Sequence, residues 1–318
     1  MQTSPNADSG HLRSRLAKVV VPVSSRQIVV SHPPAEISIE EDTVRRLLET
    51  QCPDFADQPL RFVDEGWDNV TYLVGERHAV RLPRREAAVA LLVNEQRWLP
   101  LLATRLPIEV PVPVHAGETS EWFRWPWSIV NWIPGGTAET HEFQSGDAAL
   151  LAETLVALHQ PAPDDAPVNP FRGVPLLTRH EVLESRMHLL QDHPAIDESR
   201  LKAIWRDACA APVATVRAWL HGDLHPRNVV IRDGSLAGLI DWGDLNGGDA
   251  ATDVACAWML IDAPLRRREF LQAYGASDAV RWRAMGWAVH IGLGLVDSGE
   301  PRHVPLGLAT LNRVIADA

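Results

Sequence analysis

Two short polar loops, separated by a predicted β-hairpin, constrain this chain of 318 residues more than any other feature. The first loop runs from His221 to Asn228 in the pattern His-x-Asp-x-x-x-x-Asn, with Asp223 near its start. The second loop is Ile240-Asp241-Trp242, at the far end of the predicted hairpin. Because a hairpin brings its two ends together, the fold must place Asp223, Asn228 and Asp241 close to one another.

Such a pair of loops is the layout of a phosphoryl-transfer site. That chemistry needs one carboxylate beside the attacking hydroxyl and two oxygen ligands that hold Mg²⁺ against the nucleotide phosphates. The spacing predicts Asp223 as the catalytic base, and Asn228 with Asp241 as the metal ligands. Each residue alone could equally be an ordinary turn or cap residue, so the prediction depends on all three together.

The same loop leaves a second interpretation open. His221-x-Asp223-x-His225 could supply ligands to zinc or iron in a metal hydrolase, with Asp223 as a ligand instead of a base. Sites of that kind need further His or carboxylate ligands, and no H-x-H or H-E-x-x-H cluster is present. We favour a core position for His221, bonded to the backbone, and assign no role to His225.

The composition indicates a packed globular protein with little affinity for nucleic acid, since the formal net charge is −11. Most of the acidic excess lies in the second half, which would attract a cationic substrate but would also serve solubility alone. The three cysteines form no C-x-x-C pair, which is typical of a reducing compartment. No apolar stretch is long enough to span a bilayer, so we expect a cytoplasmic protein. The oligomeric state cannot be derived.

The chain divides into a tail and two unequal lobes. Residues 1–35 are rich in Ser, Pro, Asn and Gly and predict a disordered tail. Residues 36–133 predict a small β-rich lobe, and the breaker Ile133-Pro134-Gly135-Gly136 marks its end. Within it we expect strands at 60–63, 70–74, 78–82 and 127–130 and helices at 39–50 and 85–99.

Residues 134–318 predict a larger, mostly helical lobe. The helical patterns fall at 147–159, 176–191, 198–210, 212–219 and from 252 to the end. The run Arg266-Arg267-Arg268 reads as a solvated helix face, and the twelve tryptophans read as core packing. The fold class is therefore α+β, with a small β-rich lobe that contains one main helix and a larger helical lobe.

The small lobe carries weaker signals for nucleotide binding. Gly66 and Asn69 stand in a loop between two strands, where backbone N–H groups could approach phosphates, although an ordinary turn explains them equally well. Arg81 lies on the third strand, where kinases place a lysine that pairs with a helix glutamate. Glu95 is the expected partner of Arg81, with Glu86 second.

The segment between the lobes offers a third contact for the nucleotide. Asn131, Trp132 and Ile133 leave the last strand of the small lobe just before Pro134. A strand in that position can present backbone N–H and C=O groups to an adenine edge, and it can also serve as a plain linker.

These residues resemble the aminoglycoside phosphotransferase family of the protein-kinase-like superfamily. The resemblance is strongest at His221-Gly222-Asp223 with Asn228 and at Ile240-Asp241-Trp242, and it extends from about Ala35 to near the C-terminus. Asp-Trp replaces the Asp-Phe-Gly of protein kinases. Asp249 and Asp253 match a following family segment that is mostly structural.

The resemblance implies a kinase-like fold, ATP or GTP with Mg²⁺, and phosphorylation of a hydroxyl on a small molecule such as an aminoglycoside, another antibiotic or a metabolite. It makes Asp223 the base and Asn228 and Asp241 the metal ligands. Arg81 departs from the lysine that many members carry. That departure motivates an alternative function, a nucleotide-binding regulator without catalysis.

Overall fold

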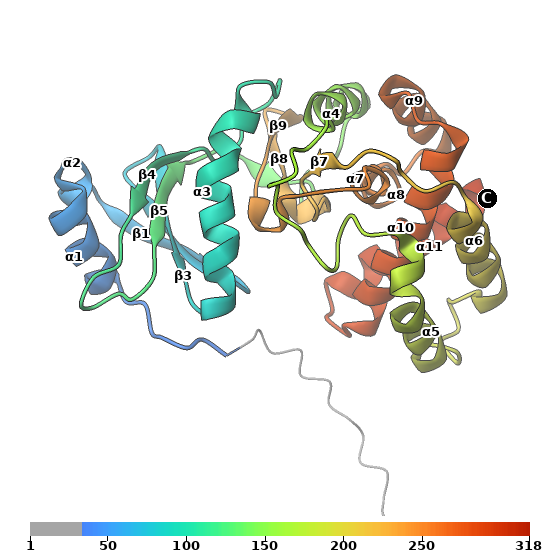
Figure 1. The fold of residues 1–318 in the computed structure, drawn as a ribbon, viewed down its shortest axis with the longest axis horizontal. Helices are drawn as coiled ribbons and strands as arrows, with labels where there is room; N and C mark the ends of the chain where they lie inside the picture. The colour runs from blue at the N-terminus through green and yellow to red at the C-terminus, as the bar shows by residue number, and fades with distance from the viewer. Residues whose placement is uncertain (1–33) are drawn as a thin grey trace, which may run out of the picture.

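The computed structural model describes residues 34–318, and the predicted tail lies almost wholly outside these residues. The described chain forms a β-rich lobe followed by a larger helical lobe, with helix α3 (Val89–Ala103) between the sheet and the second lobe (Figure 1). The predicted α+β class is confirmed.

A five-stranded antiparallel sheet is the centre of the first lobe. Its strands lie in the order β1-β2-β3-β5-β4. Their bounds are β1 Leu60–Glu65, β2 Asn69–Val74, β3 His78–Pro83, β5 Trp127–Asn131 and β4 Pro113–Gly117. Side chains alternate between the two faces of a strand, so Val80 and Leu82 enter one apolar core while Arg81 faces the opposite side.

Helices cover both faces of this sheet. The helix α1 (Glu41–Gln51), followed by α2 (Pro53–Ala56), buries Val44, Leu47 and Leu48 against the face that carries Val80. On the other face, a 3₁₀ turn (η1, Glu86–Ala88) leads into α3, which contacts β4 and β5. The face that bears Arg81 is therefore the face that α3 covers.

The second lobe is built around buried tryptophans, and Trp242, Trp258 and Trp287 are fully buried in its core. The prediction that the tryptophans are packing residues holds for these, but it is wrong for Trp67 and Trp122 of the first lobe, which are exposed. Two small sheets lie near the first lobe: β6 (Gly136–Thr137), β8 (Val229–Arg232) and β9 (Ser235–Leu239) form one, and β7 (Ala218–Leu220) with β10 (Asn246–Gly248) forms the other. The helices are α4 Ser145–Leu158, α5 His180–Leu189, α6 Glu198–Ala210, α7 Ala251–Val254, α8 Cys256–Leu260, α9 Pro264–Tyr274, α10 Asp278–Asp297 and α11 His303–Asp317, with 3₁₀ turns η2 Leu176–Arg179, η3 Pro226–Asn228 and η4 Trp242–Asp244.

Two predictions for this lobe were wrong. The expected helix at 212–219 is absent, and its end is strand β7, which pairs with β10 through Trp219 and Gly247. Val213 and Val216 are exposed, so their helix-like spacing marks no buried face. Arg267 is not solvated but is 1% exposed, with Nε 2.7 Å from the carboxylate of Asp317 in α11.

All three cysteines are free, and two of them are buried. Among residues 34–318, no helix combines the length and the apolar character needed to cross a membrane.

Candidate active site

The hairpin of β8 and β9 joins the two polar loops directly. The backbone N–H of Ile240 donates to the carbonyl of Asn228 at 2.9 Å. The Nε2 of His221 lies 3.0 Å from the carbonyl of Ile240. Ile240 precedes Asp241 and is thus bonded to both ends of the first loop. The two loops therefore lie side by side, as the sequence predicted.

His221 is a buried structural residue, as we favoured from the sequence. Its side chain is fully buried and packs beside Trp242, with 4.7 Å between ring centroids. Its Nδ1 faces the backbone N–H of Asp223 at 3.3 Å, and its Nε2 faces a carbonyl. These two partners require a neutral ring with the proton on Nε2, so His221 positions the loop.

A buried carboxylate holds the start of the same loop. Asp253, on α7, is fully buried and accepts the backbone N–H groups of His221 at 2.7 Å and Gly222 at 2.9 Å. Gly222 has φ +87°, and a Cβ there would lie 2.4 Å from the carbonyl oxygen of Asp244. Glycine is therefore required at this position both for its backbone conformation and for space.

Asp223 stands among basic groups. Its carboxylate lies 3.3 Å from Nε2 of His225 and 3.5 Å from Nη2 of Arg172. Burial by itself would raise the pKa of Asp223. The charge of His225, the hydrogen bond from its ring and the charge of Arg172 together outweigh burial and hold the pKa of Asp223 well below its usual range. The side chain therefore stays ionised at neutral pH and can accept a hydrogen bond from a hydroxyl.

Asn228 and Asp241 leave oxygen atoms free beside this carboxylate. The Nδ2 of Asn228 donates to the carbonyl of Asp223 at 2.9 Å, which fixes the amide and leaves its Oδ1 unused within the described chain. The Asp241 side chain is 58% exposed, and within residues 34–318 its one ion-pair partner is Arg81, at 3.5 Å. Free amide and carboxylate oxygens are the donors that Mg²⁺ prefers, so this pair suits a magnesium ion that keeps several waters.

The backbone of Asp241 is strained. It has φ +61° and lies in the left-handed region, which residues other than glycine rarely adopt. The one other such residue in the described chain is Asp233, which stands with Gly234 in the tight turn of the hairpin, where that conformation is ordinary. No hairpin turn explains Asp241, and strain of this kind concentrates at functional sites.

Arg81 makes the ion pair that the sequence predicted. Its guanidinium bonds directly to Glu95 on α3, which is 3% exposed, while Glu86 lies outside the pair in η1. Burial raises the pKa of Glu95, and Arg81 opposes that shift. The second guanidinium nitrogen of Arg81 faces Asp241, so the arginine joins α3 to the proposed metal ligand.

The turn that contains Gly66 and Asn69 is anchored to the end of β3. Arg84 donates to the Gly66 carbonyl at 2.8 Å, and Arg85 contacts the carboxylate of Asp68 at 2.9 Å. A Cβ on Gly66 would come no closer than 3.7 Å to another atom, so glycine is not required there by sterics. The turn itself gives no independent support for a phosphate contact.

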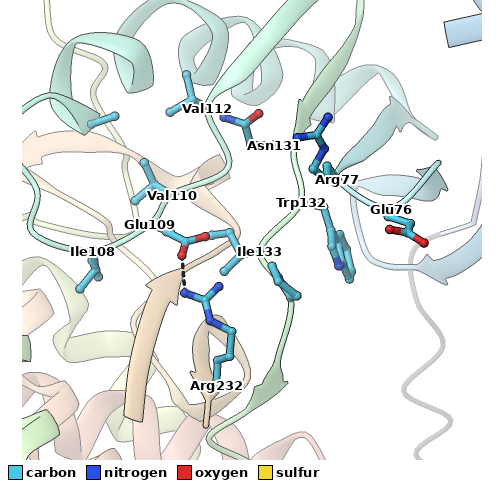
Figure 2. A pocket seen from close by; sticks show the side chains of 12 residues that line it. Glu76, Arg77, Ile108, Glu109, Val110, Val112, Asn131, Trp132, Ile133 and Arg232 are labelled. Atoms are coloured by element: carbon cyan, nitrogen blue, oxygen red, sulfur yellow. Dashed lines mark hydrogen bonds and ion pairs between the residues drawn. The ribbon is translucent and has the colours of Figure 1, made fainter.

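Asn131, Trp132 and Ile133 line a cavity of about 520 Å³ between the lobes (Figure 2). The opposite wall carries Glu109 and Arg232, which form an ion pair. Neither Asp223 nor Arg81 lines this cavity, so it adjoins the linker and not the phosphoryl-transfer groups. The N–H of Ile133 has no hydrogen-bond acceptor in the described chain, which leaves one donor free at the linker.

The comparison with protein families is decisive. The model of the phosphotransferase enzyme family matches residues 59–287, which include every candidate residue named above. The chain belongs to this family. The predicted resemblance is therefore confirmed, while no curated protein matches the sequence significantly.

Solved structures of other phosphotransferases share the fold. The GDP complex of aminoglycoside 2'-phosphotransferase-IIIa has a TM-score of 0.65 and 21% identity, over 88% of this chain and 99% of that one. The macrolide 2'-phosphotransferase MphH from Brachybacterium faecium has a TM-score of 0.58 and 21% identity, over 84% and 98%. The streptomycin–ATP–APH(2")-IIa complex has a TM-score of 0.54 and 20% identity, over 87% and 97%.

Two site residues of this phosphotransferase-family chain escaped sequence reasoning. Arg172 lies 51 positions before Asp223, in a segment without a motif, and no local signal marks it. His225 stood inside the loop, but only the structure shows that its Nε2 faces the carboxylate of Asp223. The structural role expected for Asp249 and Asp253 is seen: Asp249 pairs with buried Arg283 at 2.6 Å.

The alternative of a zinc or iron hydrolase lacks its ligands. Within residues 34–318, no group of three or more His, Cys, Asp or Glu side chains could hold a metal ion. His221 is committed to the backbone, so His225 and Asp223 alone remain from the proposed cluster.

Proposed function

We propose that this protein transfers the γ-phosphoryl group of ATP or GTP to a hydroxyl of a small molecule, with Asp223 as the base. One observation carries the proposal: the loops of Asp223, Asn228 and Asp241 are bonded together at the edge of one hairpin. Membership of the phosphotransferase family gives the reaction class, and it does not identify the acceptor.

In the proposed reaction, the hydroxyl oxygen of the acceptor attacks the γ-phosphorus as the bond to the β-phosphate oxygen breaks. The hydroxyl proton passes to a carboxylate oxygen of Asp223. Bound Mg²⁺ would neutralise charge on the phosphates, and Asn228 with Asp241 would hold it. Arg81, fixed by Glu95, would position the nucleotide phosphates, and the free N–H of Ile133 would meet the base of the nucleotide.

The proposed assignments in the first lobe differ in their support. Arg81 and Glu95 have defined geometry beside Asp241, while Asn131, Trp132 and Ile133 have a cavity and one free donor. Gly66 and Asn69 remain a prediction from position alone. We also propose a boundary between the lobes at Ile133 and Pro134 and, because its cysteines are unpaired, a cytoplasmic location.

The inactive regulator gains no support from the structure. It was motivated by arginine in place of lysine, and Arg81 makes the same kind of ion pair with a helix glutamate that the lysine makes in kinases. ATP-dependent stabilisation without transfer to any acceptor or to water would revive that alternative.

The test compares nucleotide turnover of the wild type and Asp223→Asn with a panel of hydroxylated acceptors. Loss of the base should lower turnover about 10²–10⁴-fold, because a positioned base contributes that factor. Asp233→Asn is the matched control, since Asp233 is exposed on the same hairpin and asparagine tolerates its positive φ. Equal turnover in wild type and Asp223→Asn would refute the proposal.

One neighbour of known structure, APH(2")-IIia, forms a complex with GDP and kanamycin. The net charge of −11 likewise favours a cationic acceptor for this chain. The basic side chains of Arg172 and His225, however, lie nearest to Asp223, and close to the site they favour an anionic group.

A further inference from the structure

Three arginines from consecutive segments gather beside Asp223 through Arg172: Arg172 contacts Asp223, and Arg179 lies over the ring of Phe171, the residue before Arg172. Arg172 belongs to the stretch between α4 and η2, Arg179 ends η2, and Arg186 lies on α5, which contacts α10 (Figure 1). Arg172 approaches the carboxylate of Asp223 at 3.5 Å. We call Arg172, Arg179 and Arg186 the arginine cluster.

Carboxylates of the protein satisfy this cluster only in part. Arg186 has Asp297 at 3.7 Å and the carbonyl of His290 at 3.3 Å. Within the described chain Arg179 has no carboxylate and no hydrogen-bond acceptor, and its guanidinium lies over the ring of Phe171 at 5.5 Å. The Nε atoms of Arg172 and Arg179 are shielded from water without an acceptor.

The three cations influence one another. Burial lowers the pKa of Arg179, and the charge of Arg172 lowers it further. Burial also lowers the pKa of Arg186. The charge of Asp297 opposes that shift, whereas the charges of Arg172 and Arg179 add to it. Holding like charges close together in a half-buried place costs free energy, and an anion bound among them would offset that cost.

We propose that the arginine cluster binds an anionic group of the acceptor, a carboxylate or a phosphate, and so holds the acceptor hydroxyl at Asp223. The inference rests on the proposed function and specifies its substrate class as a hydroxylated anion. Guanidinium groups match both anions because their planar forks donate two parallel hydrogen bonds. Arg179 is the residue with the most unused donors, so it is the primary anchor.

The overall acidity of the chain does not oppose this assignment. Exposed charges are screened beyond about 8 Å at physiological ionic strength, so distant acidic residues act weakly on a ligand beside Asp223. Arg172 and His225 contact Asp223 directly, and Asp244 is the carboxylate close enough to interact with Asp223 electrostatically.

The experiment is calorimetric titration of the full-length protein with four six-carbon compounds that differ in charge. Gluconate carries a carboxylate, glucose 6-phosphate a phosphate, sorbitol no charge, and glucosamine a positive charge. Titrations contain Mg²⁺ and a non-hydrolysable ATP analogue. We expect gluconate or glucose 6-phosphate to bind at least about tenfold more tightly than sorbitol and glucosamine, because one charge-assisted hydrogen-bonded pair contributes enough binding free energy for that factor. Which of the two binds more tightly distinguishes carboxylate from phosphate.

Substitutions at Arg179 test whether its guanidinium binds the anion. Arg179→Gln should weaken the preferred anion about tenfold or more, Arg179→Lys should recover part of the affinity, and Arg179→Glu should shift the preference toward glucosamine. Arg206→Gln is the control, because Arg206 is 74% exposed on α6 and pairs only with Asp207 beside it; it should bind as the wild type does.

Equal affinities across the four compounds, no measurable binding by any of them, or a preference for sorbitol or glucosamine would overturn the inference. An anion preference that survives Arg179→Gln and Arg179→Glu would also overturn it. The proposed function fails separately, if Asp223→Asn retains full nucleotide turnover. Turnover with neutral or cationic acceptors that is lost in Asp223→Asn would leave the transferase intact and reject the anion site.

Discussion

Asp253 provides the sharpest test of how the catalytic loop is positioned. Its buried carboxylate accepts two backbone N–H groups, from His221 and Gly222, at 2.7 and 2.9 Å. Asparagine in its place has one acceptor oxygen and presents an NH₂ group toward the other donor. Each buried N–H left without a partner costs about 1–3 kcal/mol, so Asp253→Asn should lose roughly 1–3 and Asp253→Ala roughly 2–6 kcal/mol.

The same substitution should also impair turnover without touching the substrate. Asp223 follows Gly222 directly, so a displaced loop moves the base, and a shift of about 1 Å costs about 10²-fold in rate. Urea denaturation gives the loss of stability, and hydrogen exchange of the 221–223 segment reports the opened N–H groups. Asp207→Asn, at a half-exposed position on α6 beside Arg206, should change neither quantity.

The reasoning would be refuted by Asp253→Asn protein with wild-type stability and wild-type exchange in that segment. Lost turnover with unchanged exchange would also count against it, because Asp253 would then act by a route other than the N–H groups of the loop.

Three other predictions concern the two loops and the helical core. Arg81→Gln should cost about 3–5 kcal/mol by leaving Glu95 unpaired in a buried site. The loss should grow as the pH rises, since burial raises the Glu95 pKa and Arg81 would no longer oppose that shift. The double variant Arg81→Leu with Glu95→Leu should be more stable to urea than Arg81→Gln. Burial lowers the pKa of His290 to about 3 from 6.5, so its contribution to stability is full above pH 6.5 and falls as the pH drops. From pH 7.5 to 5.5 the wild type should therefore lose about 1.4 kcal/mol more than His290→Gln, and equal slopes would contradict this. Gly222→Ala should cost about 1–3 kcal/mol and abolish turnover, whereas Gly234→Ala, at a similar φ with no atom within 4 Å, should retain turnover.

Much of the fold could be predicted because its signals are local. Alternating apolar residues marked β2 and β3, and a helical stripe marked α6 over 198–210 with its bounds correct. The helix predicted at 212–219 failed for a different reason. Val213, Val216 and Trp219 have helical spacing, but only pairing with β10 decides that Ala218–Leu220 is extended.

The pairing of Arg81 with Glu95 was predictable because the strand and the helix that carry them are neighbours along the chain and in space. Arg267 shows the limit of such reasoning. Its neighbours in sequence are arginines, so it reads as solvated, yet Asp317 at the far end of the chain buries it.

Local residue preferences alone bring the loops of Asp223, Asn228 and Asp241 together, since a tight hairpin joins them and its geometry follows from short-range signals. The surroundings of Asp223 depend instead on tertiary packing. Arg172 reaches Asp223 from 51 positions away, and Asp253 reaches the loop from a later helix. Contacts between distant segments depend on how whole helices pack, and no short pattern encodes that packing.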